Sequence, residues 1–359
     1  MSRSKGLYSV AFVLLWLVLL NLTLEHLLPG SWLYRYRVDY QTNKNSMAAG
    51  LNLAMDRIAA EIRANPKQDY VILLGDSVMY SGPGGPEQSI GYYLEQWSAG
   101  QGHPLKVYNL AEPANFGADV YATLLMLQQH NIPLKRVVVD QVYSDFVPYG
   151  HGIPEYSWLG DTLQRLDAGA YAAVKGSADP NAGKSWVVRY RDALLAPVPL
   201  WRDRYILQAQ IDRVLHINNT GEVTDIRPWT DKPWLKNLMQ DPQYRRFVDP
   251  KPFDMTPANP QIAILQRMIA HLKGAEPLFI FTPVNHALLA PGADSPEYQA
   301  NLKRVSDWFT AQQVRYLDLS SAMPSDQFVD HVHLMPEGYR QLAAIIGQEL
   351  LKPPAAVQK

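Results

Sequence analysis

Short apolar runs alternate with amphipathic stretches along most of this chain. Five runs are dominated by valine, isoleucine, leucine and aromatic residues and are bounded by polar or turn-forming residues. Runs of this kind, without polar alternation, are typical of strands buried on both faces of a parallel sheet. We therefore predict parallel strands at residues 70–74, 105–110, 136–140, 277–282 and 314–318.

Stretches with apolar residues at helical spacing lie between these runs, which predicts an α/β fold. Prolines at two helix starts, Pro296 and Pro336, support the last two helices. A further amphipathic stretch begins at Met47 and precedes the first strand. The main predicted helices cover residues 88–100, 117–131, 258–273, 296–313 and 336–351.

The N-terminus departs from this pattern. Residues 7–24 carry no charge, and a bilayer-spanning helix needs about 17–25 residues. Arg3 and Lys5 precede the run, so the positive-inside rule predicts a cytoplasmic N-terminus. An uncleaved anchor is favoured over a signal peptide, because the run is long and no small-x-small site follows it. We expect a single-pass protein of the cytoplasmic (inner) membrane, with its C-terminal domain in the periplasm or extracytoplasmic space.

We predict an anchor over residues 1–29, a stalk and helix over 30–66, and one domain over 67–359. Within that domain, residues of about 149–257 lack the strand–helix repeat and are too many for an ordinary connection, so they form an insertion or cap. Its tryptophans build a small core of their own, or some of them stack on a sugar or line an acyl groove. Five of the nine tryptophans lie there, namely Trp158, Trp186, Trp201, Trp229 and Trp234.

Composition narrows the function. The chain has 33 basic and 34 acidic side chains, so no basic excess favours binding of nucleic acid. It has no cysteine, which excludes disulfides, thiolate zinc sites and a cysteine nucleophile. We predict no cofactor.

Ser77 is the candidate nucleophile. It follows Gly75 and Asp76 at the carboxyl end of the first strand, the edge at which active sites of open parallel sheets form. A serine hydroxyl needs a base, a group that orients the base, and donors for the developing oxyanion. Taken alone, Gly-Asp-Ser is also compatible with an ordinary turn that caps a helix.

A second motif stands before the last helix. Asp330 precedes His333 by three residues and can fix the tautomer of the imidazole, which leaves the other ring nitrogen for a serine. His331 is the rival base, but its spacing is less suitable. The arrangement needs a turn, which the helix start at Pro336 favours. A metal site is disfavoured, because three ligands within four residues lack ordinary zinc geometry.

Together, Gly75-Asp76-Ser77 after a strand and Asp330-x-x-His333 before the last helix resemble the SGNH (GDSL-like) hydrolase superfamily, over about residues 69–351. The resemblance implies a flavodoxin-like three-layer sandwich with a parallel sheet. It also implies a Ser77–His333–Asp330 triad and ester hydrolysis or acyl transfer.

Two other sequence motifs of that superfamily, its second and third blocks, are altered in this chain. The oxyanion donor of the second block stays open among Ala114, Asn115 and Gly117, and Ser144 stands where the third block has asparagine. A missing donor costs about 100–1000-fold in rate, so slow hydrolysis is expected. Asp76, beside the nucleophile, is a further candidate for contact with the oxyanion or the substrate.

The anchor, these departures and the stretch from Phe281 to His286 are similar to membrane-anchored SGNH-like proteins that modify envelope polymers. These include the D-alanyl transfer protein of lipoteichoic acid synthesis and the alginate and peptidoglycan O-acetylation proteins. The resemblance implies a multi-spanning membrane-bound O-acyltransferase as partner, an acyl donor and a polymer acceptor. Asn285 and His286 either face the substrate, or serve as a loop cap and an exposed histidine.

The leading interpretation is an anchored extracytoplasmic serine O-acyltransferase or esterase. It would move an acetyl- or D-alanyl-type group to or from an envelope polysaccharide or teichoic-acid-like polymer through an acyl-Ser77 intermediate. One alternative is a non-catalytic SGNH-like protein that binds polymer or scaffolds a membrane acyltransferase. The other is a lipase or thioesterase.

Overall fold

The fold is built on one parallel sheet. The computed structural model describes residues 3–27, 29–40, 47–150, 153–176, 186–195, 198–215 and 225–352. All neighbouring strands pair in parallel, in the order β2-β1-β3-β4-β5. This is the order of flavodoxin-like doubly wound folds, so the predicted parallel α/β class is confirmed. The strands are β1 Tyr70–Leu74, β2 Lys106–Asn109, β3 Arg136–Gln141, β4 Glu276–Phe281 and β5 Arg315–Asp318.

The sheet is the middle of three layers. All five side chains of β1 are buried, as are those of Val137, Val138 and Val139 in β3. Successive side chains of a strand point to opposite faces, so burial of consecutive residues means that helices cover both sides. This is why the strands could be recognised as continuous apolar runs.

Five longer helices flank the strands, and all five were predicted. Helix α5 packs against α16, and α6 packs against α13. Ser295 caps α15 by accepting a hydrogen bond from the Tyr298 amide, with Pro296 in the first turn, as the sequence pattern indicates. These helices are α5 Ile90–Gly100, α6 Gly117–Gln129, α13 Pro260–His271, α15 Pro296–Ala311 and α16 Pro336–Leu351.

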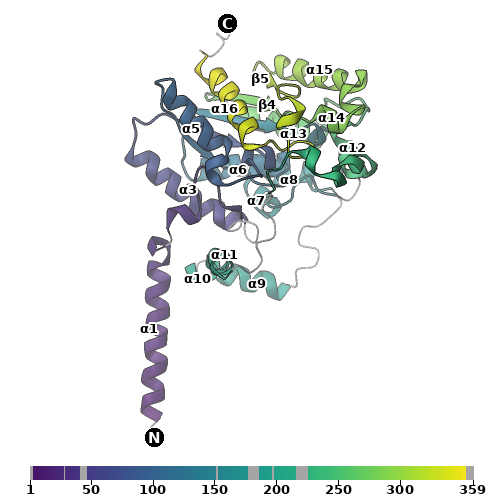
Figure 1. Ribbon diagram of the computed structural model, residues 1–359. Helices are drawn as coiled ribbons and strands as arrows, with labels where there is room; N and C mark the ends of the chain where they lie inside the picture. The colour runs from purple at the N-terminus through teal and green to yellow at the C-terminus, as the bar shows by residue number, and fades with distance from the viewer. Residues whose placement is uncertain are drawn as a thin grey trace.

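Most of the remaining elements surround this core, but the helices within residues 186–214 lie apart from it, near the N-terminal helix, as Figure 1 shows. Between β3 and β4, the described residues form helices and turns and contain no strand. The α-helices are α3 Met47–Ala64, α4 Ser77–Tyr80, α7 Gly160–Leu166, α8 Ala168–Val174, α9 Trp186–Leu195, α10 Pro199–Arg202, α11 Arg204–Val214, α12 Pro242–Arg245 and α14 His286–Leu289. The short 3-10 helices are η1 Gly30–Trp32, η2 Pro86–Gln88, η3 Tyr143–Phe146, η4 Trp229–Asp231, η5 Pro233–Gln240, η6 Arg246–Val248, η7 Gly292–Asp294 and η8 Ser325–Gln327.

Helix α1, Arg3–Leu27, extends away from the body of the molecule (Figure 1). Between residues 8 and 22, the apolar side chains that are described are mostly exposed, among them Phe12, Trp16 and Leu22. Counting only the residues that are described, no helix combines the length and the apolarity that crossing a membrane requires. The anchor therefore stays a prediction.

The tryptophans of the predicted insertion have different surroundings. Trp229 is partly buried against the main core, whereas Trp234 is 61% exposed. The guanidinium groups of Arg191 and Arg204 lie over the ring of Trp201. The side chain of Trp186 lies outside the described residues. These tryptophans do not form one common core among the described residues.

Candidate active site

The end of β1 is shaped by a close contact with β3. A Cβ atom on Gly75 would lie 1.7 Å from the Asp140 Oδ1 atom, so only glycine fits beside this carboxyl group. The next amide, of Asp76, donates to the same Asp140 oxygen at 3.2 Å. The contact fixes where the chain leaves the sheet, immediately before Ser77.

Ser77 is the first residue of the short helix α4. The Asp76 side chain caps that helix by accepting a hydrogen bond of 2.8 Å from the Val78 amide. Asp76, predicted as a candidate for oxyanion or substrate contact, thus holds the turn that carries the nucleophile. The helix ends at once, because Ser81 adopts the left-handed conformation with φ of 66°.

The loop before α16 contains the turn that the Asp330–His333 spacing requires. Phe328 and Leu334 form an antiparallel bridge, which closes the loop. Inside it, the Asp330 Oδ1 atom accepts hydrogen bonds from the amides of Val332 (2.9 Å) and His333 (2.8 Å). These bonds fold the chain back, so that Asp330 and His333 lie side by side.

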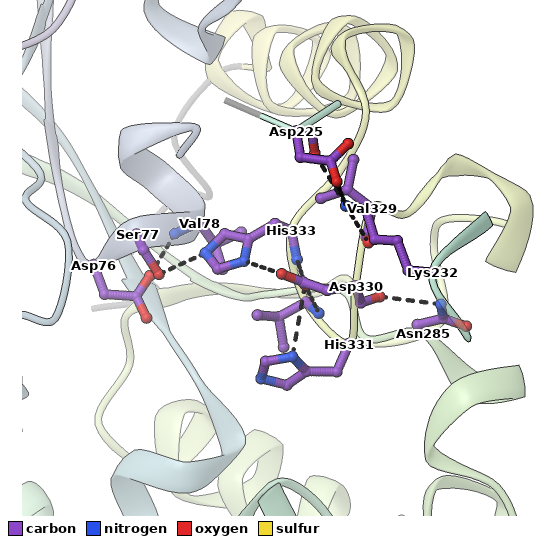
Figure 2. Close-up of polar contacts among 11 residues, drawn as sticks. Asp76, Ser77, Val78, Asp225, Lys232, Asn285, Val329, Asp330, His331 and His333 are labelled. Carbon is purple, nitrogen blue, oxygen red and sulfur yellow. Dashed lines mark hydrogen bonds and ion pairs between the residues drawn. The ribbon is translucent and has the colours of Figure 1, made fainter. Parts of the chain in front are cut away.

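Three side chains then form a continuous hydrogen-bonded line, which Figure 2 shows. The His333 Nδ1 atom lies 2.8 Å from the Asp330 Oδ2 atom, and the His333 Nε2 atom lies 2.8 Å from the Ser77 Oγ atom. The structure thus brings together all three residues of the predicted triad. With Nδ1–H donating to the carboxylate, Nε2 is the acceptor for the Ser77 proton, as general-base activation requires.

The charges around His333 favour its protonated form. Burial lowers the pKa of His333, but the Asp330 carboxylate, through its charge and its hydrogen bond, and the Asp76 charge outweigh this and raise it above its ordinary value. Burial acts to raise the pKa of Asp330, and the contact with His333 holds it well below its usual range. Asp330 is therefore the ionised partner of the pair.

His331 is not placed to act as the base. Its ring lies edge-on to the rings of Tyr244 and Phe247, with centroids 4.8 and 4.5 Å away. Burial lowers its pKa to about 4. Its Nδ1 atom lies 3.6 Å from the Asp330 Oδ1 atom, and Figure 2 shows this contact but none between His331 and Ser77. Within the described part of the chain, no group of three or more carboxylate and imidazole side chains is arranged to hold a metal ion.

The loop after β2 lies against the nucleophile turn. The Glu112 amide donates to the Gly75 carbonyl at 3.2 Å, and the Asn115 Nδ2 atom donates to the same oxygen at 3.3 Å. Ala114 adopts the left-handed conformation, with φ of 59°, which favours glycine. Of the predicted oxyanion candidates, Ala114 and Asn115 thus belong to a loop in contact with the residue two positions before Ser77.

The other two oxyanion candidates have different environments. Gly117 begins α6 and packs against Gln261, whose Oε1 atom would lie 2.0 Å from an added Cβ. Ser144 lies in η3, and its carbonyl accepts a hydrogen bond from Arg246 at 2.9 Å. Among the described residues, no hydrogen bond joins either residue to Ser77.

Asn285 and His286 have structural partners. The Asn285 Oδ1 atom caps α14 by accepting from the Leu288 amide at 3.2 Å, and Nδ2 donates to the Asp330 carbonyl at 3.1 Å. His286 lies between Asp294, at 2.9 Å from Nδ1, and Ser321, at 3.1 Å from Nε2. Asn285 therefore supports the loop that carries Asp330, while His286 belongs to a separate surface cluster.

The carboxyl groups of Asp140 and Asp145, which interact with Asp76, were not predicted as site residues. Asp140 is the penultimate residue of β3 and is buried, and burial together with the Asp76 charge raises its pKa well above the usual range. Burial and the same charge raise the pKa of Asp145 to about 8. A sequence signal existed for Asp140, because a charged residue closes an apolar strand next to β1.

The comparisons with known proteins give only distant likenesses. The lipase/acylhydrolase from Enterococcus faecalis has 14% identity and a TM-score of 0.40, over 80% of this chain and 100% of that one. Est24, a carbohydrate acetylesterase from Sinorhizobium meliloti, has 11% identity and a TM-score of 0.37, over 79% and 98%. The aryl esterase of M. smegmatis has 11% identity and a TM-score of 0.36, over 79% and 98%. No protein-family model and no curated protein matches the chain.

Proposed function

We propose that this protein is a serine enzyme of the SGNH type that cleaves or transfers acyl groups. The observation that carries the proposal is the Ser77–His333–Asp330 line, with both hydrogen bonds at 2.8 Å, at the carboxyl edge of a parallel sheet. A nucleophile, a base and a group that orients the base are the parts that acyl transfer needs.

The reaction follows from this geometry. The Ser77 Oγ atom attacks the acyl carbonyl while His333 Nε2 takes its proton, and Asp330 stabilises the resulting imidazolium. The tetrahedral intermediate collapses when His333 returns the proton to the leaving oxygen, which leaves an acyl group on Ser77. An incoming hydroxyl group, from water or from a sugar or polyol, then attacks that ester with His333 again as the base. The acyl group leaves on the acceptor and Ser77 recovers its proton.

The acyl acceptor we propose is a hydroxyl group of an envelope polymer, with α1 as the membrane anchor. Support comes from the charge-free run of residues 7–24 and from the exposed apolar side chains of α1. A multi-spanning membrane-bound O-acyltransferase would supply the acetyl- or D-alanyl-type group. A gene for such a protein beside this one would support transfer over hydrolysis.

A serine-directed fluorophosphonate tests the triad without knowledge of the substrate. We expect the purified full-length chain to be labelled, and Ser77→Ala to lose the label. The matched control is Ser321→Ala, because Ser321 is an exposed serine whose Oγ atom also bonds a histidine, His286, at 3.1 Å. The control should label like the wild type. Equal labelling of Ser77→Ala and wild type would disprove the proposal.

Transfer and hydrolysis are separated by one further assay. The full-length protein is given p-nitrophenyl acetate with and without glycerol as a model acceptor. A transferase releases p-nitrophenol faster when glycerol is present and forms acetylglycerol, whereas a hydrolase forms only acetate at an unchanged rate. Ser77→Ala should abolish both products.

A further inference from the structure

The loop that carries the base is held from outside by the segment that precedes η5. The Trp229 amide donates to the Phe328 carbonyl at 3.0 Å, and the Lys232 Nζ atom donates to the Val329 carbonyl at 3.0 Å. The Trp229 indole also donates to the Ser325 carbonyl at 2.8 Å. A segment nearly a hundred residues earlier in the chain thus contacts the loop directly before Asp330.

The opposite side of the loop is held by the connection after β4. Asn285 donates through Nδ2 to the Asp330 carbonyl at 3.1 Å and through its amide to the His331 carbonyl at 2.9 Å. Four consecutive carbonyl groups, from Phe328 to His331, therefore each accept a hydrogen bond from another part of the chain. This fixes the backbone from which the Asp330 and His333 side chains extend.

Lys232 is the unusual member of this set. The residue is 5% exposed, and an unpaired buried ammonium group is costly. Its Nζ atom donates to the carbonyl groups of Val329 and Asp225, both at 3.0 Å, and lies 3.7 Å from the Asp225 Oδ2 atom. Figure 2 shows Lys232 between Asp225 and Val329. Two of the three N–H donors of the ammonium group thus bond carbonyl oxygens, and the Asp225 carboxylate lies close enough to balance its charge.

We propose that Lys232 is a positioning residue of the reaction, which locks the Val329–Asp330 backbone so that Asp330 and His333 stay aligned with Ser77. The inference rests on the proposed function. It assigns to the region between β3 and β4 a role in the chemistry, because a charged side chain of that region holds the loop of the base.

The position of Lys232 also affects the charge of His333. The groups that act on His333 are Asp330 on its own loop, Asp76 at the start of α4, and Lys232. The neighbouring His331 ring lies 6.4 Å away, centroid to centroid. The Lys232 charge lowers the pKa of His333, while Asp330 and Asp76 raise it. Loss of the ammonium group should therefore raise the pKa of His333.

The test is Lys232→Met in the full-length protein, measured as the rate constant of fluorophosphonate labelling from pH 5 to 9. We expect a plateau rate about 10–100-fold lower, since small misplacements of catalytic groups cost about this much. The acidic limb of the profile should move to higher pH. Lys232→Arg, which keeps the charge, should return the limb toward its original pH. Lys236→Met is the matched control, because Lys236 is an exposed lysine of η5, four residues further along the chain, and it should label like wild type.

A second variant covers the case in which Lys232→Met fails to fold. Asp225→Asn retains the backbone carbonyl that Lys232 contacts but removes the neighbouring carboxylate charge. The ammonium charge is then less compensated, so the acidic limb should move to lower pH, opposite to the shift for Lys232→Met.

The outcomes separate this inference from the proposed function. A wild-type chain that does not label refutes both. If the wild type labels and Ser77→Ala does not, the triad stands. Two results would then overturn the role of Lys232 alone. One is a folded Lys232→Met variant with the plateau rate and the acidic limb of the wild type. The other is an Asp225→Asn variant whose acidic limb does not move.

Discussion

The amide of Asp76 donates a 3.2 Å hydrogen bond to the buried carboxyl group of Asp140, which places two carboxyl-bearing residues next to the Ser77 turn. The contact joins the ends of two neighbouring strands, β1 and β3. Two adjacent carboxyl groups do not both ionise readily, so the pair keeps a proton. The remaining charge on Asp76 favours the imidazolium form of His333, which is the form that appears in the transition state.

Gly75→Ala should destabilise the fold. The new methyl group would lie 1.7 Å from the Asp140 Oδ1 atom and 2.3 Å from its Cγ atom, so the carboxyl group or the backbone must shift. We expect a loss of about 3 kcal/mol or more in the free energy of unfolding, measured by chemical denaturation. Gly100→Ala is the control, because an added Cβ there meets no heavy atom within 4 Å. Equal stability of the two variants would rule out the close contact.

Asp145→Asn should make the protein less sensitive to alkaline pH. The pKa of Asp145 is about 8 in the fold and about 4 in an unfolded chain, so the fold holds a proton that the unfolded chain releases between these values. Wild-type stability is thus lost as pH rises from about 4 to 8. Between pH 5 and 8, the free energy of unfolding of the variant should rise by on the order of 2 kcal/mol relative to the wild type. The measurement is the melting temperature of both proteins across this pH range.

Asp307→Asn, at an exposed carboxylate of α15, serves as the comparison for Asp145→Asn. Its melting temperature should follow that of the wild type across the same range. A constant difference between Asp145→Asn and the wild type from pH 5 to 8 would contradict the raised pKa of Asp145.

The pH profile of the wild-type enzyme should have its acidic limb above pH 6.5. His333 acts as a base only when neutral, and its pKa lies above the ordinary value of about 6.5. The labelling rate should therefore rise with pH through this raised pKa. A limb below pH 6.5 would show that burial outweighs the Asp330 carboxylate.

Asp330→Asn should lower activity and move the acidic limb of the pH profile to lower pH. Without the carboxylate, the pKa of His333 falls and the imidazole can take the wrong tautomer, which costs about 10⁴-fold in rate for triads of this kind. Labelling rates against pH give both quantities. Since the pKa of Asp330 is lowered in the fold, its stabilising contribution is present above about pH 4 and is lost as pH falls. A variant with the wild-type rate would exclude Asp330 from the triad.

Removal of residues 1–29 should release the protein from membranes. The full-length chain is expected in the membrane fraction after cell lysis and the shortened chain in the soluble fraction, because the truncation removes the charge-free run. Labelling of Ser77 in the shortened chain shows that its catalytic domain is intact. Full-length protein in the soluble fraction would refute the anchor.

Much of the core could be predicted because its signals are local. Buried parallel strands are continuous apolar runs, and the predicted run at 70–74 is β1 itself. The triad could be predicted because an Asp three residues before a His suits one loop, and because strand ends meet at one edge of the sheet. The observed Ser77–His333 contact agrees with that expectation.

Other parts of the site depend on contacts that no local pattern encodes. Lys232 reaches Val329 across 97 positions of sequence, and nothing around Lys232 distinguishes it from a surface lysine. The sequence did not distinguish substrate contact from a loop cap for Asn285, because its bond to the Asp330 carbonyl forms only when two loops meet. The function of Ser144 stays a prediction, because its hydroxyl group makes no hydrogen bond to Ser77 among the described residues.

The two ends of the catalytic hydrogen bond lie 256 residues apart in sequence. A ribosome-bound chain thus exposes the Ser77 turn long before it possesses a base. Any nascent or proteolysed fragment that stops short of the loop at Asp330 has an ordinary, unreactive hydroxyl group. On the proposed function, Ser77 gains its base only after the loop at Asp330 has been synthesised and has folded against the Ser77 turn.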